Sequence, residues 1–138
     1  MQTLFWLFLG LVVGLVFIGF TRRLGEKVER RILAFGLIAA ALVYAVLAII
    51  SDAPGWIAVE LAGVLVFSFF AERGLKRSIF WLMVGWAAHP FWDAGLHLSG
   101  VGADVAPAFY VFMCIGFDIL VAAYIFLQMQ RQLAAKLP

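Results

Sequence analysis

The sequence predicts an all-α protein, a polytopic transmembrane bundle of five helices, and three observations support this prediction. Of the 138 residues, 66% are hydrophobic and only 13% are charged, whereas a soluble domain is nearer half apolar and a quarter charged. The apolar residues gather in five segments, each near the length that crosses a hydrocarbon core of about 30 Å. All ten Lys and Arg residues lie between or after these segments. So few charges cannot cover a soluble globule, and most of the surface should therefore face lipid.

The first two spans are long apolar runs that end at polar connections. The first covers residues 4–20 and stops at Thr21-Arg22-Arg23, and the second covers residues 32–50. The second stops at Ser51-Asp-Ala-Pro-Gly, a compact turn of residues that interrupt helices. Helices are expected because transmembrane strands would show alternation over segments of about ten residues.

The remaining three spans follow the same plan. The third covers residues 56–71 and ends before Glu72-Arg73, the fourth covers residues 79–98, and the fifth covers residues 108–127 and leads into an amphipathic tail. No repeat, low-complexity tract or soluble domain interrupts the pattern. We therefore expect residues 1–138 to form one transmembrane domain.

The basic residues predict the orientation of the chain. They fall only in the first connection, the third connection and the C-terminal tail, whereas the N-terminus and the second and fourth connections contain none. Short loops rich in Lys and Arg stay in the cytoplasm. Five spans with the N-terminus outside and the C-terminus inside satisfy this rule without exception, and the formal charge of +2 needs no other explanation.

The fourth span carries the most informative stretch of the chain, His89-Pro-Phe-Trp-Asp93-Ala-Gly-Leu-His97. Four-residue spacing places these three ionisable groups on one stripe of a helix, each about 40° round from the last. Ionisable groups at membrane depth are costly and by default mark functional sites. Pro90 should also kink the helix, because it cannot donate a hydrogen bond to the carbonyl of Trp86.

Two neighbouring spans carry ionisable groups at similar depth. From the helical rise, Asp93 should lie about 6 Å and His89 about 12 Å deeper than His97, which is nearest the outer interface. Glu60 should lie about 6 Å below the outer end of the third span, and Asp118 of the fifth span should reach about the depth of His89. This convergence predicts an interior pocket, shared by three helices and open to the outside.

Imidazole and carboxylate groups are good ligands for zinc, copper, iron, manganese or nickel. We predict an outward-facing site for a divalent transition metal, with His89, Asp93, His97 and Asp118 as ligand candidates and Glu60 and Cys114 as secondary candidates. The two histidines are eight residues apart, too far to share an ion comfortably. One ion would therefore use Asp93 with one histidine, whereas two ions could share Asp93 as a bridge. A haem held by both histidines would need a second protomer.

The same groups support two other interpretations. His89, Asp93 and Asp118 could serve as acid and base in a metal-free membrane enzyme with a lipophilic substrate, or as the relay of a proton-linked transporter. In a structural subunit of a membrane complex, Asp–His pairs would instead lock helices together. Gly10 and Gly14 form a small-xxx-small pair, which could pack within one chain or form a homo-oligomer.

The stretch from Gly85-Trp86 through His89 and Trp92-Asp93 to His97 resembles a pattern in small, uncharacterised bacterial integral membrane proteins with five spans. There a Gly-Trp precedes a His, a Trp-Asp and one or two further His on a late helix, and the proline after His89 is a departure from it. The resemblance implies a multi-pass protein of the bacterial inner membrane and names no activity. A looser similarity is to sterol isomerase-like membrane proteins, in which a His and a Glu four residues apart protonate and deprotonate a lipid. Asp93 would replace that Glu with a shorter reach.

Several function classes are excluded by composition. A single cysteine excludes an intrachain disulfide and any multi-cysteine zinc or iron–sulfur motif. Nothing resembles a nucleotide-binding loop or a nucleic-acid-binding fold, so we expect neither a nucleotide cofactor nor a nucleic-acid partner. The expected partners are membrane lipids.

The distribution of basic residues makes a direct prediction about topology. Reporter fusions after Asp52 and Asp104 should report an exterior location, and fusions after Lys27 and Lys76 should report a cytoplasmic one, because basic loops are retained in the cytoplasm. A cytoplasmic signal after Asp104 would contradict the five-span arrangement.

Overall fold

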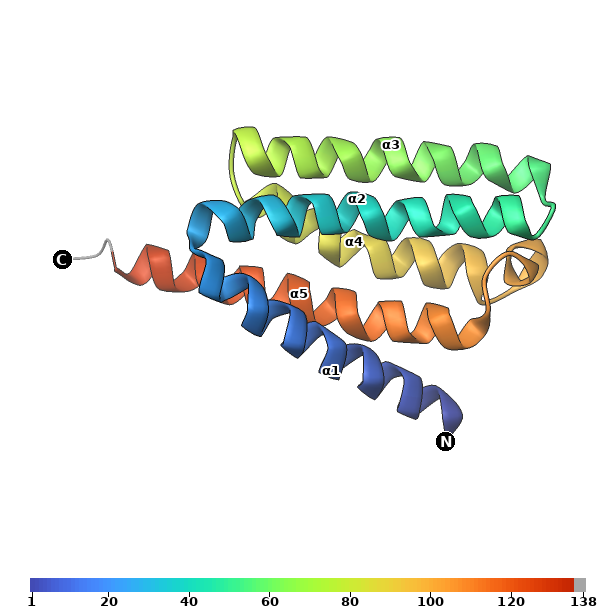
Figure 1. Cartoon of the computed structure of the whole chain (residues 1–138), viewed down its shortest axis with the longest axis horizontal. Helices are drawn as coiled ribbons and strands as arrows, with labels where there is room; N and C mark the ends of the chain where they lie inside the picture. The colour runs from blue at the N-terminus through green and yellow to red at the C-terminus, as the bar shows by residue number, and fades with distance from the viewer. Residues whose placement is uncertain (136–138) are drawn as a thin grey trace.

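The computed structural model describes residues 1–135, and these residues form five α-helices joined by short connections (Figure 1). The helices are α1 (Gln2–Thr21), α2 (Glu26–Ile50), α3 (Pro54–Lys76), α4 (Phe80–His97) and α5 (Ala108–Ala134), with 3-10 turns η1 (Arg22–Leu24) and η2 (Gly100–Asp104). Each predicted span coincides with one helix or lies within it, to within one residue at either end. The predicted all-α fold is confirmed.

The helix ends follow from local sequence. Gly25 precedes α2 with a φ of 85°, a backbone conformation that favours glycine. Glu26 and Glu29 occupy the first turn of α2, where negative charge interacts favourably with the helix dipole. Pro54 opens α3, where its missing N–H has no helical partner to lose. The helix α2 therefore begins at Glu26 rather than at residue 32, because part of the charged connection is itself helical.

The helices α2 to α5 lie side by side, whereas α1 diverges from α2 toward the N-terminus (Figure 1). The helix α1 packs along α5, α2 packs along α3, and α4 packs against both α3 and α5. At one end of the bundle lie η1, the α3–α4 connection and the end of α5; at the other lie the N-terminus, the α2–α3 turn and η2 (Figure 1). We call these the basic end and the opposite end, since the first contains the connections with Lys and Arg.

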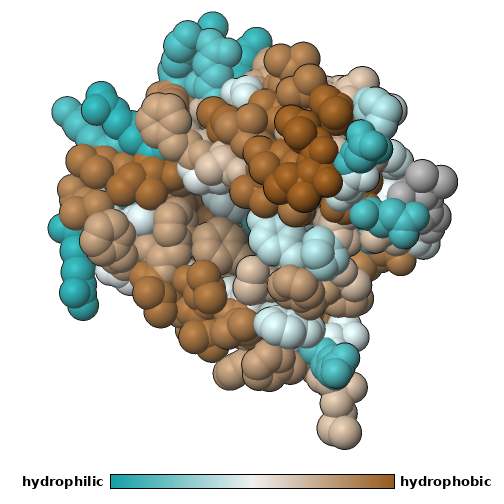
Figure 2. Space-filling model, turned by 45° about the vertical axis from the view of Figure 1, so that its right-hand side comes forward, coloured by the Kyte–Doolittle hydropathy of each residue, from teal (hydrophilic) through white to brown (hydrophobic). Residues whose placement is uncertain are grey.

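The surface between the two ends is largely apolar. Large hydrophobic side chains are widely exposed, including Phe91 at 81% and Leu65 at 73%, and Figure 2 shows apolar residues over much of the visible face. Four of the helices, α1, α2, α3 and α5, are long and apolar enough to cross a membrane. The predicted fourth span, α4, is less apolar because it carries His89, Asp93 and His97, all of which are buried.

An apolar core fills the half of the bundle nearer the basic end. It contains side chains from all five helices, among them Leu33, Phe67, Leu82, Trp86 and Ile125, each exposed by 1% or less. Helices in lipid associate mainly through such close packing, because lipid chains are as apolar as the side chains themselves. This core holds α4 in place, and α4 continues as one helix through Pro90.

The helix α1 approaches α5 closely through glycines on both helices. A Cβ atom at Gly10 would overlap the backbone carbonyl of Met113, and a Cβ atom at Gly116 would overlap the carbonyl of Leu7. Small residues permit this backbone approach in membrane helices. The glycine pair predicted from the sequence therefore serves packing within one chain at Gly10.

Because of this contact, Gly10 and Gly19 of α1 should respond differently to substitution. Gly10→Ala should destabilise the protein by about 1–3 kcal/mol, the usual cost of overpacking, because the added methyl group meets a backbone carbonyl. Gly19→Ala is the matched control, since a Cβ atom there meets nothing within 4 Å, and alanine is the better helix former. The measurement is thermal unfolding in detergent. Equal melting temperatures for the two variants would show that α1 does not depend on this contact.

Candidate functional site

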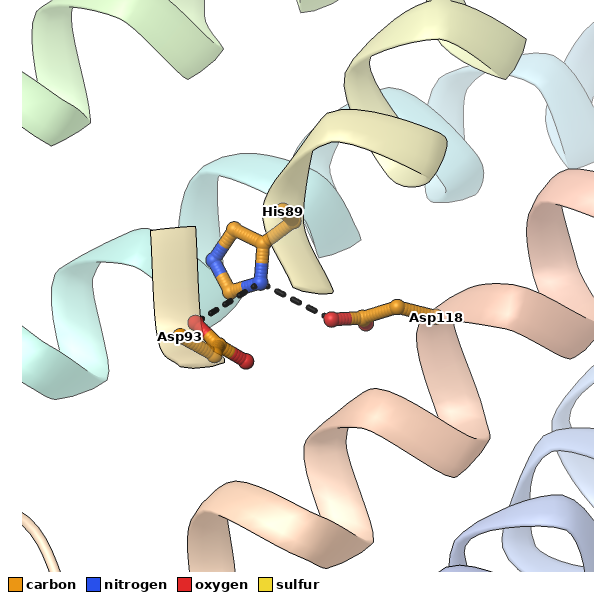
Figure 3. Close-up of side chains that lie close together, drawn as sticks. All are labelled: His89, Asp93 and Asp118. Atoms are coloured by element: carbon orange, nitrogen blue, oxygen red, sulfur yellow. Dashed lines mark hydrogen bonds and ion pairs between the residues drawn. The ribbon is translucent and has the colours of Figure 1, made fainter. Parts of the chain in front are cut away.

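Three ionisable side chains converge between α4 and α5. His89 and Asp93 lie one turn apart on α4, and Asp118 faces them from α5 (Figure 3). The His89 Nδ1 atom lies 2.8 Å from Asp118 Oδ2 and 3.4 Å from Asp93 Oδ1. Each residue offers a potential ligand atom, and these atoms lie within 4.8 Å of one another. The side chains of His89 and Asp93 are fully buried, and Asp118 is 1% exposed.

Helix periodicity and helix packing together create this cluster. The four-residue spacing puts His89 and Asp93 on the face of α4 that packs against α5. Asp118 lies on the buried stripe of α5 with Val111, Val121 and other small or apolar residues. A carboxylate in an otherwise apolar stripe must meet a partner from another helix, and it meets His89.

The electrostatic arrangement of the cluster is unbalanced. With Nδ1 as the donor, His89 forms a hydrogen bond to Asp118 Oδ2, which leaves Asp93 beside the same nitrogen without a hydrogen bond. Among the residues that the structure describes, Asp93 and Asp118 each form an ion pair with His89 and with no other side chain. A single imidazole can carry one positive charge, so two ionised carboxylates would leave a net negative charge away from water, which is costly.

A second buried pair, Glu60 of α3 and His97 of α4, lies nearer the opposite end. Their Oε1 and Nε2 atoms are 3.3 Å apart, although the geometry is not that of a hydrogen bond. The other ring nitrogen of His97 faces the carbonyl oxygen of Gly102 at 3.2 Å, and Trp92 donates to Glu60 at 3.3 Å. A backbone carbonyl on one imidazole nitrogen orients the ring and leaves the other nitrogen available as a ligand.

Tyr44 of α2 lies between the two groups and was not among the residues predicted from the sequence. Its ring stacks on His97 with centroids 4.6 Å apart and lies 5.9 Å from His89. The side chain is 1% exposed, and its hydroxyl has no hydrogen-bond partner. A tyrosine within an apolar span, several residues from its end, was the available signal. Trp92 and Gly102 were also missed, because a ring nitrogen and a loop carbonyl show no pattern in sequence.

The unsatisfied polar atoms of the described residues gather in this region. The buried side-chain atoms without a hydrogen bond are Tyr44 Oη, Glu60 Oε1, His89 Nε2, Asp93 Oδ1 and Oδ2, and His97 Nε2. Buried polar groups in folded proteins are nearly always hydrogen-bonded, and the exceptions require an explanation. Donor and acceptor atoms without hydrogen bonds to the protein, placed together, are what a site for a metal ion or for ordered water provides.

A different buried carboxylate in this bundle accepts hydrogen bonds at both of its oxygens. Glu29 of α2, which is 6% exposed, accepts hydrogen bonds from the Tyr124 hydroxyl and the Gln128 amide of α5. Neither oxygen of Asp93 accepts one. This bundle can therefore surround a buried carboxylate with protein donors, but it does not do so at Asp93.

The predicted site residues are thus divided into two groups. His89, Asp93 and Asp118 come together, whereas His97 pairs with Glu60 instead of joining them. Cys114 is half-buried and lies one turn from Asp118 on α5, in the wall of a cavity that Asp118 also lines.

The expected opening to the outside is closed in this structure. The turn η2 packs against α4, and a Cβ atom at Gly102 would overlap the carbonyl of Leu96 and meet the Trp56 ring at 2.7 Å. His97 beneath this turn is 1% exposed. The α4–α5 connection is therefore a cover over the site, which its Gly-Val-Gly sequence did not reveal.

Comparison with known proteins identifies the family and no activity. No curated protein and no solved structure matches the chain. A model described as a family of unknown function (DUF6010) matches residues 6–131, and the chain therefore belongs to the DUF6010 family.

Proposed function

We propose that this protein binds a divalent transition metal ion at His89, Asp93 and Asp118. The observation that carries the proposal is the convergence of three potential ligand atoms from two helices, within 4.8 Å of one another in a buried position. Three protein ligands of this kind, with further positions left for water or substrate, are typical of catalytic metal sites. Imidazole with carboxylate suits zinc, copper, iron, manganese or nickel.

Charge and hydrogen bonding both support a cation at this position. A divalent ion would neutralise the two carboxylates that His89 alone cannot balance. It would also provide a partner for the Asp93 oxygens, neither of which accepts a hydrogen bond from the protein. His97 and Glu60 have the arrangement expected of a second ligand pair, because the Gly102 carbonyl orients the imidazole and leaves Nε2 toward the carboxylate. A second ion at this pair is the two-metal form of the same proposal.

The membrane placement that we propose has five spans, with the N-terminus outside and the C-terminus in the cytoplasm. The grouping of the basic connections at one end of the bundle supports it (Figure 1). The helix α4 would cross with the others, since its ionisable groups face the interior of the bundle and not the lipid. The resemblance to bacterial membrane proteins favours the bacterial inner membrane, and the metal site would lie in its outer half.

An alternative is a metal-free acid–base enzyme that acts on a lipophilic substrate. The observation in its favour is the 2.8 Å hydrogen bond between His89 and Asp118, together with the apolar cavity that Asp118 lines. An imidazole paired with a carboxylate is suited to proton transfer near neutral pH. A proton-linked transporter has less support. A proton path through the bundle would have to cross the apolar core, which includes Leu33 and Ile125 and lies between this cluster and the basic end.

Metal content tests the leading proposal directly. Protein purified without chelator or immobilised nickel should contain about one divalent transition metal ion per chain, the number that the three-residue site predicts. Asp93→Asn should weaken metal binding, because the amide keeps the shape of the side chain and loses its charge. The loss should exceed the factor of about 10 to 100 that is typical when a residue outside the ligand sphere is changed. His97→Gln should retain the ion at the three-residue site.

The control is Asp104→Asn, because Asp104 is an exposed acid of η2. It should leave metal content unchanged. Wild-type protein that holds no metal, even after equilibration with zinc, copper, iron, manganese and nickel, would refute the proposal and leave the acid–base interpretation in place.

Stability of the metal-free protein separates a functional cluster from a structural lock. His89→Ala should cost about 3–5 kcal/mol, because it removes the shared partner of two buried carboxylates. The triple variant His89→Leu, Asp93→Val, Asp118→Val should unfold at the same temperature as the wild type or above it, since apolar residues of similar volume replace buried ion pairs without loss. The readout is thermal unfolding in chelator. A large loss of stability in the triple variant would assign the cluster to the structural subunit interpretation.

A further inference from the structure

A cavity of about 270 Å³ lies among α1, α2 and α5, next to the candidate metal site. Its walls include Val13 and Phe17 of α1, Gly36 and Val43 of α2, and Asp118 of α5. The lining is almost entirely apolar. The cavity adjoins the site and shares Asp118 with it, whereas His89 and Asp93 are not among its lining residues.

The divergence of α1 from α2 provides the space. The helix α1 packs along α5 and meets α2 at few positions. Opposite this separation, α2 presents the small residues Gly36, Ala39 and Ala40. A Cβ atom at Gly36 would only reach ordinary contact with Trp86 and Phe17, at 3.4 and 3.5 Å, so the glycine widens the cavity without being required by close packing.

The mouth of the cavity opens on the apolar flank of the bundle. Val13 is 44% exposed and Val43 is 38% exposed, and both belong to helices long and apolar enough to cross a membrane. Neighbouring exposed residues on α1, such as Val16 at 69%, continue this apolar surface. In the proposed membrane placement, a cavity with this rim would open to the hydrocarbon region and not to water.

The inner end of the cavity is polar and belongs to the candidate site. Asp118 lines it and also forms the 2.8 Å hydrogen bond to His89, and Cys114 lies one helical turn away on the same wall. From Tyr110, which also lines the cavity, to Asp118 the wall runs about 12 Å along α5. A molecule in this cavity would contact a carboxylate of the site without crossing the aqueous phase.

We infer that this cavity binds one hydrocarbon chain of a membrane lipid, which enters from the bilayer between α1 and α2 and lies against Asp118. Apolar walls disfavour a hydrated or charged ligand. The volume is below the about 300–1,000 Å³ of pockets that enclose a whole drug-sized molecule, so it suits a stretch of one acyl or prenyl chain. Binding of the chain requires no metal. Where the proposed function holds, the inference also names its substrate class, a lipid presented from within the membrane.

Fluorescence quenching of Trp86 tests this inference, since this ring lines the cavity and is only 1% exposed. The probe is phosphatidylcholine with bromine atoms on its acyl chains, compared with the unbrominated lipid in otherwise identical vesicles. Wild type and Trp86→Phe are measured in parallel, and their difference isolates the Trp86 signal from the other tryptophans. We expect about twofold quenching of that signal, because a bound chain brings bromine into contact with the ring.

Two variants close the cavity in different ways, and one control leaves it open. Ala40→Phe fills the interior of the cavity. Val43→Phe obstructs its rim and perturbs the packing of the bundle less. Each variant should abolish most of the Trp86 quenching. Ala62→Phe adds the same ring to an exposed position on α3 outside the cavity and should have no effect. Trp86 that is unquenched in the wild type, or quenched equally in the Val43 and Ala62 variants, would overturn the inference.

The outcome is independent of the metal measurement. Asp93→Asn should leave the quenching unchanged, and Val43→Phe should leave the metal content unchanged, because the cavity and the ligand cluster share only Asp118. Quenching without metal would preserve the lipid inference and refute the metal proposal. Metal binding without quenching would preserve the metal proposal and refute the lipid inference.

Discussion

The requirement that buried polar groups find partners shapes this bundle more than any other constraint. At the basic end the requirement is met by the protein itself: Glu29 is surrounded by donors from α5, and Arg30 donates to the Gly74 carbonyl of α3. These contacts join α2 to α3 and α5 where the connections emerge. In the other half of the bundle several buried polar atoms around His89 and Asp93 have no hydrogen bond. The two halves therefore differ in how completely the protein satisfies its buried polar groups.

The position of the cluster depends on the apolar core beneath it. Trp86, one turn before His89, is anchored by a hydrogen bond from its indole to the Leu33 carbonyl and by packing in the core. The phenyl ring of Phe67 lies 4.6 Å from the His89 ring. The His89 imidazole, with Phe67 against its ring and Asp118 bonded to its Nδ1 atom, has little freedom to turn, which would favour a preorganised site. The core thus both seals the cluster from the basic end and sets its geometry.

Access to the cluster follows from what surrounds it. The apolar core closes one direction, and η2 with Trp56 covers the other. The flank between α1 and α2 is where a cavity approaches the site, and it does so through Asp118. Close packing of α1 on α5 at Gly10 and looser contact with α2 belong to the same arrangement, since a helix fixed along one neighbour can leave space beside the other.

Much of the fold follows from the sequence alone. Apolar runs of spanning length, breakers at Ser51–Gly55 and segregated basic residues are local signals, so all five helices could be located, although α2 begins at Glu26 rather than at residue 32 and α5 ends at Ala134 rather than at residue 127. The stripe of His89 and Asp93 is also local, because it requires only the periodicity of one helix. Asp118 could be brought to the right depth by counting residues along its span.

Only the tertiary structure decides which groups meet. Depth along a helix says nothing about rotation around it, so the sequence could not separate His97, which turns to Glu60, from His89, which turns to Asp118. Tyr44 was overlooked for the same reason, since its role comes from the face of α2 that packs inward. The cover formed by η2 and the cavity beside α1 depend on the packing of segments far apart in sequence. Helical rise and hydropathy are properties of a segment, whereas partners, access and satisfaction of polar atoms are properties of the packed bundle.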